Sequence, residues 1–219
     1  MKLTYPSVLL LGVLLALPAC PEQTAESPTP DFRNAFWGMT QEQVKSTESV
    51  TPAEIHQIGE EVIVKYDAPL EEGVPRRLIY IFAKDKLVRA KYIFDQEHEE
   101  LNDFILDFRT AEPPLREKYG KPASEHAVWE NDAFQLERLP YLDQDRALAS
   151  DILPSDQYAG LSVSLGYLRL FSQWVTPRTR IVHALTGANS RITHQIEYRS
   201  SEFEALENTV LHQNTSGLR

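Results

Sequence analysis

The chain has 219 residues, with 22 lysines and arginines against 32 aspartates and glutamates, so its formal net charge at pH 7 is −10. Such an acidic chain repels phosphate backbones and anionic headgroups, which excludes nucleic acid as an expected partner. A single cysteine excludes a disulfide within the chain, so an apolar core must supply the stability. The length suits one large domain or two small ones.

The first segment is typical of a secretory signal peptide. Lys2 precedes an apolar run from Val8 to Leu17, which is too short to span a bilayer because that needs roughly 20 residues. The run ends in Leu17-Pro18-Ala19-Cys20, which resembles the lipobox of bacterial lipoproteins. This resemblance implies a signal peptide over residues 1–19 and a lipidated N-terminus at Cys20. The alternatives are an ordinary secretory signal with an unpaired thiol, or a buried N-terminal helix.

Residues 20–30 are expected to form a flexible tether behind the lipidated cysteine. Prolines and small polar residues fill this segment and cannot bury a core. In polyproline conformation its ten residues after the cysteine reach up to about 30 Å. Pro21 stands where an aspartate favours retention in the inner membrane of Gram-negative bacteria, so we expect the outer membrane, with the domain facing the periplasm. Removal of residues 1–19 takes away one lysine and leaves a net charge of −11.

The first half of the domain, which begins at about residue 31, predicts a helix and a β-meander. Thr40 and Gln43 match a capping box, so a helix should begin at Gln41, with Met39 and Val44 as a hydrophobic staple. Three strands should follow, at Val62–Ala68, Arg76–Ala83 and Leu87–Asp95. A turn centred on residues 84 and 85 would give the meander one apolar face, formed by Ile79, Ile81, Val88, Ala90 and Tyr92.

The second half predicts another helix and further strands. Its helix should start near Glu97, break near Thr110 before Pro113-Pro114, and resume for one turn that ends at Gly120. Strands are expected at Ala127–Asn131, Leu161–Trp174, Thr179–Thr186 and Arg191–Tyr198. The last two are joined by Gly187-Ala188-Asn189-Ser190 as a hairpin turn. After Ser201 and Glu204, another capping box, a C-terminal helix is expected, with fraying over the last six residues.

The order helix-strand-strand-strand thus occurs twice, which predicts an α+β fold. We expect two helix-plus-antiparallel-meander repeats that form a sheet with helices packed on one face. Repeat one covers about residues 31–95 and repeat two about 96–200 of a periplasmic domain over 31–219. A long loop is expected at about 134–160 and a C-terminal tail at 201–219.

Two short motifs carry a resemblance to known families. Trp37-Gly38-Met39-Thr40 with Val44 gives W-G-M-T-x-x-x-V, and Phe82 to Val88 gives F-x-x-x-x-L-V. This pattern resembles tandem-repeat lipoproteins and inhibitors of the beta-lactamase-inhibitor-like fold, and is similar to the SmpA-type outer-membrane assembly lipoproteins. The resemblance covers Phe36 to Phe94, about a third of the mature chain, and the second half lacks the G-M-T cap. It implies a noncatalytic protein that binds other proteins through a concave sheet.

The sequence shows no recognised catalytic motif. Phosphate loops, HExxH, CxxC and GxSxG are absent, and acylation of Cys20 would remove the one thiol nucleophile. Four aspartates of the long loop could gather a calcium ion, but they lack the glycine and terminal glutamate of an EF-hand: Asp143, Asp145, Asp151 and Asp156. We therefore expect no enzyme and no cofactor.

His183 and His194 are the most specific candidate pair. A symmetric four-residue loop at 187–190 would place them opposite each other on the two hairpin strands, with Cβ atoms about 5 Å apart. They could then bind a metal together or sense pH. Their neighbours on that face are apolar and two ligands do not complete a zinc site, which favours buried, neutral, hydrogen-bonded histidines instead.

Aromatic side chains are the remaining candidates for binding. Trp174 and the other two tryptophans, with several tyrosines, could line an exposed face for a peptide or glycan, although core packing explains them equally. If a sheet face stays uncovered, its expected outward residues are Tyr80, Arg89 and Lys91.

The sequence thus predicts a lipid-anchored periplasmic protein that binds another envelope protein and touches the membrane only through its anchor. The first alternative is a carrier or sensor of a small ligand or metal that uses His183 and His194. The second is a hydrolase with a dispersed site in the long loop.

Overall fold

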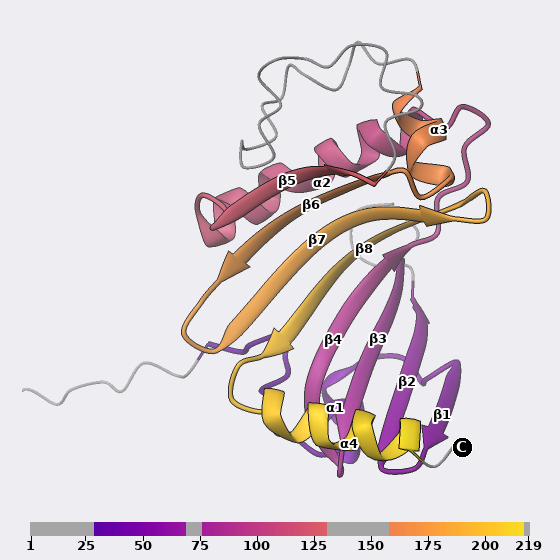
Figure 1. The fold of residues 1–219 in the computed structure, drawn as a ribbon. Coiled ribbons are helices and arrows are strands. Elements are labelled where there is room, and N and C mark those ends of the chain that lie inside the picture. The colour runs from indigo at the N-terminus through magenta and orange to yellow at the C-terminus, as the bar shows by residue number, and fades with distance from the viewer. Residues whose placement is uncertain (1–28, 69–75, 131–157, 217–219) are drawn as a thin grey trace, which may run out of the picture.

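The computed structural model of this protein describes residues 29–68, 76–130 and 158–216, which form an α+β fold as predicted (Figure 1). This part of the chain contains one antiparallel sheet of eight strands and four helices. The helices are α1 (Gln41–Thr47), α2 (Asp103–Tyr119), α3 (Ala159–Ser164) and α4 (Glu204–Ser216). The strands are β1 (Glu54–Ile58), β2 (Glu61–Ala68), β3 (Arg76–Ala83), β4 (Lys86–Phe94), β5 (Ser124–Trp129), β6 (Leu168–Val175), β7 (Thr179–Ala188) and β8 (Arg191–Ser200). None of the described helices is long and apolar enough to cross a membrane.

The strands follow the order β1-β2-β3-β4-β8-β7-β6-β5 across the sheet. Each half of the described chain therefore begins at an outer strand and ends at the centre, where β4 pairs with β8. One apolar cluster runs through both halves and joins Tyr80 of β3, Leu115 of α2 and Ile196 of β8. The two halves consequently share a core.

The capping box at the start of α1 is confirmed. The Thr40 hydroxyl accepts a hydrogen bond from the Gln43 backbone N–H, and the Gln43 side chain accepts one from the Thr40 N–H. The helix begins at Gln41, and its backbone N–H donates to Asp85 in the turn between β3 and β4. These bonds tie the helix start to the meander.

The predicted faces of this meander are wrong in part. The turn lies at residues 84 and 85 as expected, but the pairing of β3 with β4 shifts by one residue next to Ile81. Ala90 and Tyr92 therefore lie on the face of Tyr80, opposite Ile79 and Ile81. No residue pattern in β4 predicts this register shift.

Both faces of the meander are covered, so the expectation of helices on one face is not confirmed. On the first face, Tyr80 packs with Phe32 of the N-terminal segment and Val44 of α1. On the second face, Ile79 and Ile81 pack with Val210 of α4. In Figure 1, α4 lies across the lower strands and α2 lies along the upper ones. The first strand, β1, is also absent from the sequence-based prediction.

Helix α2 starts at Asp103 rather than near Glu97, and it continues through Pro113-Pro114. A proline inside a helix costs about 3 kcal/mol because it removes a hydrogen bond and its ring meets the preceding turn. Phe108 before the pair and Leu115 after it are both buried, and each buried side chain of this size contributes about 1.5–3 kcal/mol. Packing on both sides of the prolines therefore offsets their cost. Gly120 ends the helix as predicted, with φ 78°.

Three other predictions in the second half need correction. Residues 161–164, expected to be strand, belong to helix α3, because a short apolar run does not distinguish the two structures. The hairpin between β7 and β8 turns on two residues, Asn189 and Ser190, and not on four. The C-terminal helix reaches Ser216, where the Asn214 amide donates to the Ile58 carbonyl of β1 at 2.9 Å.

Candidate functional site

Tyr80 and Trp174 lie in the core, which corrects their prediction as exposed binding residues. Tyr80 is fully buried, and its hydroxyl donates to the carboxylate of Glu48. Trp174 is buried too, and its indole N–H donates to the Gly120 carbonyl at 2.8 Å, just after α2. The face on which Tyr80 lies is covered by Phe32 and α1, so it offers no free surface.

Arg89 and Lys91 lie on the opposite face of the sheet from Tyr80. The Arg89 Nε lies 2.7 Å from Glu207 Oε1 of α4, and its Nη1 lies 3.4 Å from Glu197. Lys91 is half-buried beside them, and this burial lowers the pKa of its amine, while Glu197 opposes the effect. Arg89 therefore joins the helix to the sheet and is not free to meet a partner.

A cluster of charges fixes α4 to this face, and sequence reasoning missed it. Glu207 is buried between Arg89 and Arg199, whose Nε lies 3.5 Å from it, and Glu204 approaches Arg180. Burial raises the pKa of the Glu207 carboxyl, and the two arginines oppose that rise. The acidic residues of α4 appear in the sequence as an ordinary solvated helix start, so nothing there indicates that Glu207 meets Arg89, more than a hundred residues earlier in the chain.

One stretch of sheet surface in the described chain carries no helix. It lies on β5–β8, on the side opposite α2 and α3, whose buried residues Phe108 and Val163 pack with Leu170 and Leu185 on the other side. Cross-strand pairing places two rows of side chains on it. We call this surface the docking face; it consists of His126, Phe171, Gln173, Val182, Ala184 and Gln195, and the row of Gln173 and Val182 continues into Ser124 on one side and Glu197 on the other.

The docking face is mixed in chemistry. Phe171 and His126 are cross-strand neighbours with ring centroids 4.9 Å apart, and the two glutamines flank apolar side chains. These side chains are half-buried among their neighbours, apart from the buried Ala184. The face thus combines an aromatic ring, aliphatic side chains and amide groups, with Glu197 next to Val182.

His183 and His194 touch, although the predicted register is wrong. Because the turn has two residues, His183 pairs with Ile196 and His194 pairs with Leu185, so the histidines are diagonal neighbours. Their Nε2 atoms nevertheless lie 2.8 Å apart, and both side chains are buried. The predicted alternative of buried, hydrogen-bonded histidines describes this arrangement.

The two imidazoles are enclosed by aromatic rings. Phe108 of α2 stacks on His183 with a centroid distance of 4.0 Å, and Phe94 of β4 stacks on His194 at 3.9 Å. Burial lowers the pKa of His183 well below its usual value, and burial lowers that of His194 to about 3. Both are therefore neutral at pH 7. The described residues contain no group of three or more side chains placed to hold a metal ion.

Glu112 of α2 links this pair to a buried polar chain that sequence reasoning missed. Its Oε1 lies 3.9 Å from Nδ1 of His183 and accepts a hydrogen bond from Ser172, while its Oε2 accepts from Arg116 at 3.0 Å. Arg116 also pairs with the buried Glu125 of β5. The spacing of Glu112 and Arg116, four residues apart on one helix, is the one sequence signal that could have found it.

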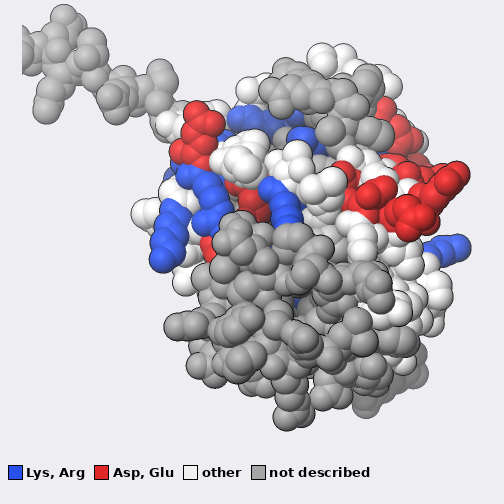
Figure 2. All heavy atoms as spheres, turned by 90° about the horizontal axis from the view of Figure 1, so that it is seen from above, with Lys and Arg blue, Asp and Glu red and all other residues white. Residues whose placement is uncertain are grey.

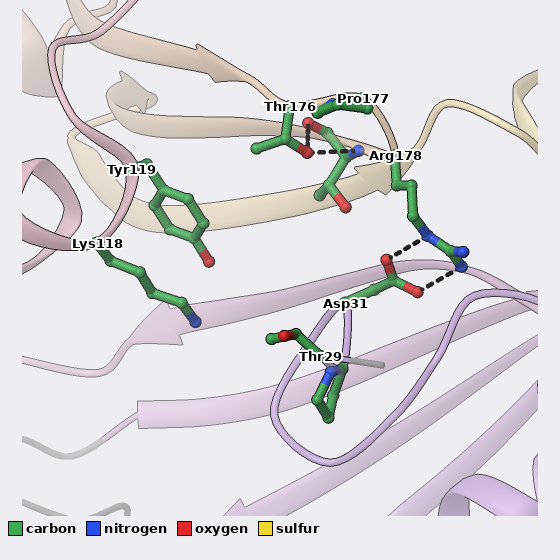
Figure 3. Close-up of a pocket in the computed structure, with 9 residues that line it drawn as sticks. Thr29, Asp31, Lys118, Tyr119, Thr176, Pro177 and Arg178 are labelled. Carbon is green, nitrogen blue, oxygen red and sulfur yellow. Dashed lines mark hydrogen bonds and ion pairs between the residues drawn. The ribbon is translucent and has the colours of Figure 1, made fainter. Parts of the chain in front are cut away.

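A cleft of about 460 Å³ lies between the N-terminal segment, the end of α2 and the turn after β6. In Figure 3, Lys118 and Tyr119 point into it from α2, toward Thr29 and Asp31. Asp31 accepts two hydrogen bonds from Arg178, at 2.8 and 2.9 Å, and one from the Trp37 backbone. Figure 2, seen from above, shows lysine and arginine side chains mixed with acidic ones on the left and a group of acidic side chains on the right. Within the cleft, Arg178 is neutralised by its ion pair with Asp31, which leaves Lys118 as the further charged residue of the lining.

Several predicted features lie outside the described residues. These are the signal peptide, Cys20, the tether up to residue 28, the four loop aspartates and most of the predicted loop at 134–160. No protein family, curated protein or solved structure matches the chain. The resemblance to lipoproteins and inhibitors therefore stays a prediction.

Proposed function

We propose that this protein is a lipid-anchored, noncatalytic binding module of the bacterial envelope, which faces the periplasm from the outer membrane and holds another envelope protein. The observation that carries the proposal is the docking face on β5–β8. A sheet surface that combines an aromatic residue, aliphatic residues and amides, with none of the described helices on it, is a composition that interaction sites share.

The docking face also has a rigid base. Its strands are packed from behind by Phe108 of α2 and Val163 of α3, so a partner would meet a preformed surface. A preformed surface loses little conformational entropy on binding, which favours a specific complex over an adaptable one.

We further propose that the two halves are structural repeats. The first half consists of one helix and four strands, the second of two helices and four strands, and the final strands β4 and β8 pair at the centre of the sheet. This order supports a duplicated unit with one change, since α3 interrupts the second half.

The test is site-specific photo-crosslinking of the full-length protein in native envelopes. A photoreactive amino acid at position 171 should give a discrete crosslinked partner, whereas the same group at the exposed Leu106 of α2 should not. The Val182→Glu substitution should abolish the crosslink at 171 because it places a charge in the centre of the face. Equal labelling from 171 and 106, or none from either, would count against the proposal.

A second candidate function rests on the 2.8 Å approach of the His183 and His194 Nε2 atoms, which could close on a metal ion. Zinc titration followed by calorimetry separates it from the first. Stoichiometric binding that disappears in His183→Phe would favour a metal carrier or sensor, and no heat of binding would exclude zinc as its cargo.

A further inference from the structure

The histidine pair lies where four elements meet. His183 belongs to β7 and His194 to β8, Phe94 comes from β4, and Phe108 and Glu112 come from α2. Helix α2 therefore contacts the histidine pair through the ring of Phe108 and the carboxylate of Glu112. A change in the protonation of the pair therefore acts directly on the contact between α2 and the sheet.

Hydrogen-bond chemistry allows one proton between the two Nε2 atoms. In a neutral pair one imidazole donates through Nε2–H and the other accepts through its Nε2 lone pair. Neither Nδ1 has a hydrogen-bond partner among the described residues. The Glu112 Oε1 lies 3.9 Å from Nδ1 of His183, and its negative charge favours a proton on that nitrogen, which makes His183 the acceptor and His194 the donor between the Nε2 atoms.

While α2 is packed on the sheet, neither imidazole can bind a further proton without an unfavourable contact. On Nε2 of His183 it would face the N–H of His194, and on Nδ1 of His194 it would stay buried without an acceptor. Among the described residues, two charged groups face the pair: Glu112 from α2, bonded to Ser172 and Arg116, and Arg76 from β3, whose guanidinium lies 4.9 Å from the Phe94 ring. Arg76 repels added positive charge, and the attraction of the Glu112 carboxylate is offset in part by its ion pair with Arg116.

We propose that the His183–His194 pair is a pH-dependent switch, which we call the catch: it holds α2 on β7 and β8 at neutral pH and releases the helix in mild acid. When α2 lifts, both imidazoles reach water and each binds a proton. This inference goes beyond the proposed function and does not depend on it.

The size of the effect follows from proton linkage. An imidazole in water titrates near pH 6.5, so at pH 5 each of the two favours the open state by about 30-fold, and together by about 1,000-fold relative to pH 7.5. Below pH 6 the logarithm of the opening constant should therefore rise by about two for each unit by which the pH falls, since two protons bind on opening.

Hydrogen exchange of the full-length protein between pH 7.5 and pH 5 tests the catch, with rates corrected for the intrinsic pH dependence of exchange. The α2 amides around Phe108 and Leu115 should show an uptake of two protons on opening. His183→Gln and His194→Gln should each reduce this count to about one, and His212→Gln, on the exposed side of α4, should leave it at two.

Three results would overturn the catch. The first is an opening of α2 that takes up no protons in the wild-type protein. The second is a proton count that stays at two in either pair variant. The third is exchange of the β7 and β8 amides at the same rate as those of α2, because the event would then be global unfolding and not release of the helix. The first and third need no variant, so a variant that fails to fold does not block the test.

Discussion

Gly187 lies where β7 passes beneath α3, and the absence of a side chain there sets how closely the two approach. A Cβ atom at this position would lie 1.9 Å from the Val163 carbonyl oxygen and 2.7 Å from its carbon. Both contacts are with backbone, which cannot rotate away as a side chain does. Gly160 in α3 meets the backbone of Leu101 in the same manner.

Gly187→Ala should therefore destabilise the protein by about 3 kcal/mol, since overpacking forces the backbone of α3 to shift. The measurement is the midpoint of urea unfolding, followed by circular dichroism. Thr186→Ala, at the neighbouring half-buried position of β7, is the control, because it adds no atom toward α3. Equal losses in both variants would contradict the close approach of α3 and β7.

For single residues, the sequence predicted which side chains interact better than it predicted their positions in the sheet. The contact between His183 and His194 was predicted from their spacing about a turn. The predicted turn had four residues, however, so the predicted partner of His183 was two residues away from its actual partner, Ile196. The Glu112 carboxylate was missed because its partners lie on β6 and β7, and long-range contacts leave no local pattern. Tyr80 was expected to be exposed for the same reason, since the residues that bury it belong to the N-terminal segment and α1.

Among the elements, α4 is attached to the sheet by few apolar contacts and by charge. Val210 reaches the cluster of Ile79 and Ile81, and Glu207 lies between two arginines. Removing one partner of a buried ion pair leaves the other charges unpaired, which costs more than the pair itself contributes.

Glu207→Gln should lower the free energy of unfolding by at least about 2 kcal/mol, because Arg89 and Arg199 lose their common carboxylate. The value is below that of a fully buried pair since both arginines keep partial exposure. Thermal unfolding measures the change, with Glu202→Gln at an exposed position as control. If both variants melt at the wild-type temperature, the charges do not hold the helix.

The proline pair in α2 gives a prediction of the opposite sign. Pro113→Ala should stabilise the protein by about 1 kcal/mol, because it restores a backbone N–H inside a helix that already bends to accept the ring. Pro177→Ala, in the exposed turn after β6, should instead cost about 0.5 kcal/mol through added freedom of the unfolded chain. Denaturant unfolding of the two variants side by side tests both signs, and a loss at position 113 would contradict the first.

Strands were predicted more reliably than helix limits. Alternating apolar residues placed β3, β4, β7 and β8 within a few residues of their bounds. The break of α2 near Thr110, before Pro113-Pro114, was predicted from a local rule that holds only when nothing outside the helix compensates, and buried Phe108 and Leu115 do compensate. Strand β1 was missed because all of its residues are exposed and carry no apolar pattern.

For the whole molecule, the proposed anchor makes a sharp prediction about location. The full-length protein should fractionate with outer membranes and carry acyl chains on Cys20, whereas Cys20→Ser should appear in the soluble fraction with an unchanged fold. Two or more acyl chains make anchoring stable at about 0.8 kcal/mol for each buried CH₂. Mass spectrometry of the N-terminal peptide detects the acyl groups.

A companion variant, Pro21→Asp, should move the protein to the inner membrane if the usual sorting rule applies. Density-gradient separation of the two membranes measures this. A Cys20→Ser protein that still sediments with membranes would contradict the anchor, and a Pro21→Asp protein that stays in the outer membrane would contradict the sorting alone.

The meeting of β4 and β8 at the centre of the sheet has a consequence for how the chain is made. Arg89 pairs with Arg199, so the central ladder closes only after nearly the whole sequence has left the ribosome or the translocation pore. Until then β4 is an open edge, with one row of backbone N–H and C=O groups unpaired beside an apolar surface. Closing so distant a contact is slow, and a β4 edge from one newly made chain can pair with that of another in the meantime. We therefore expect that pairing between newly made chains, and not low stability of the finished fold, limits the yield of folded protein.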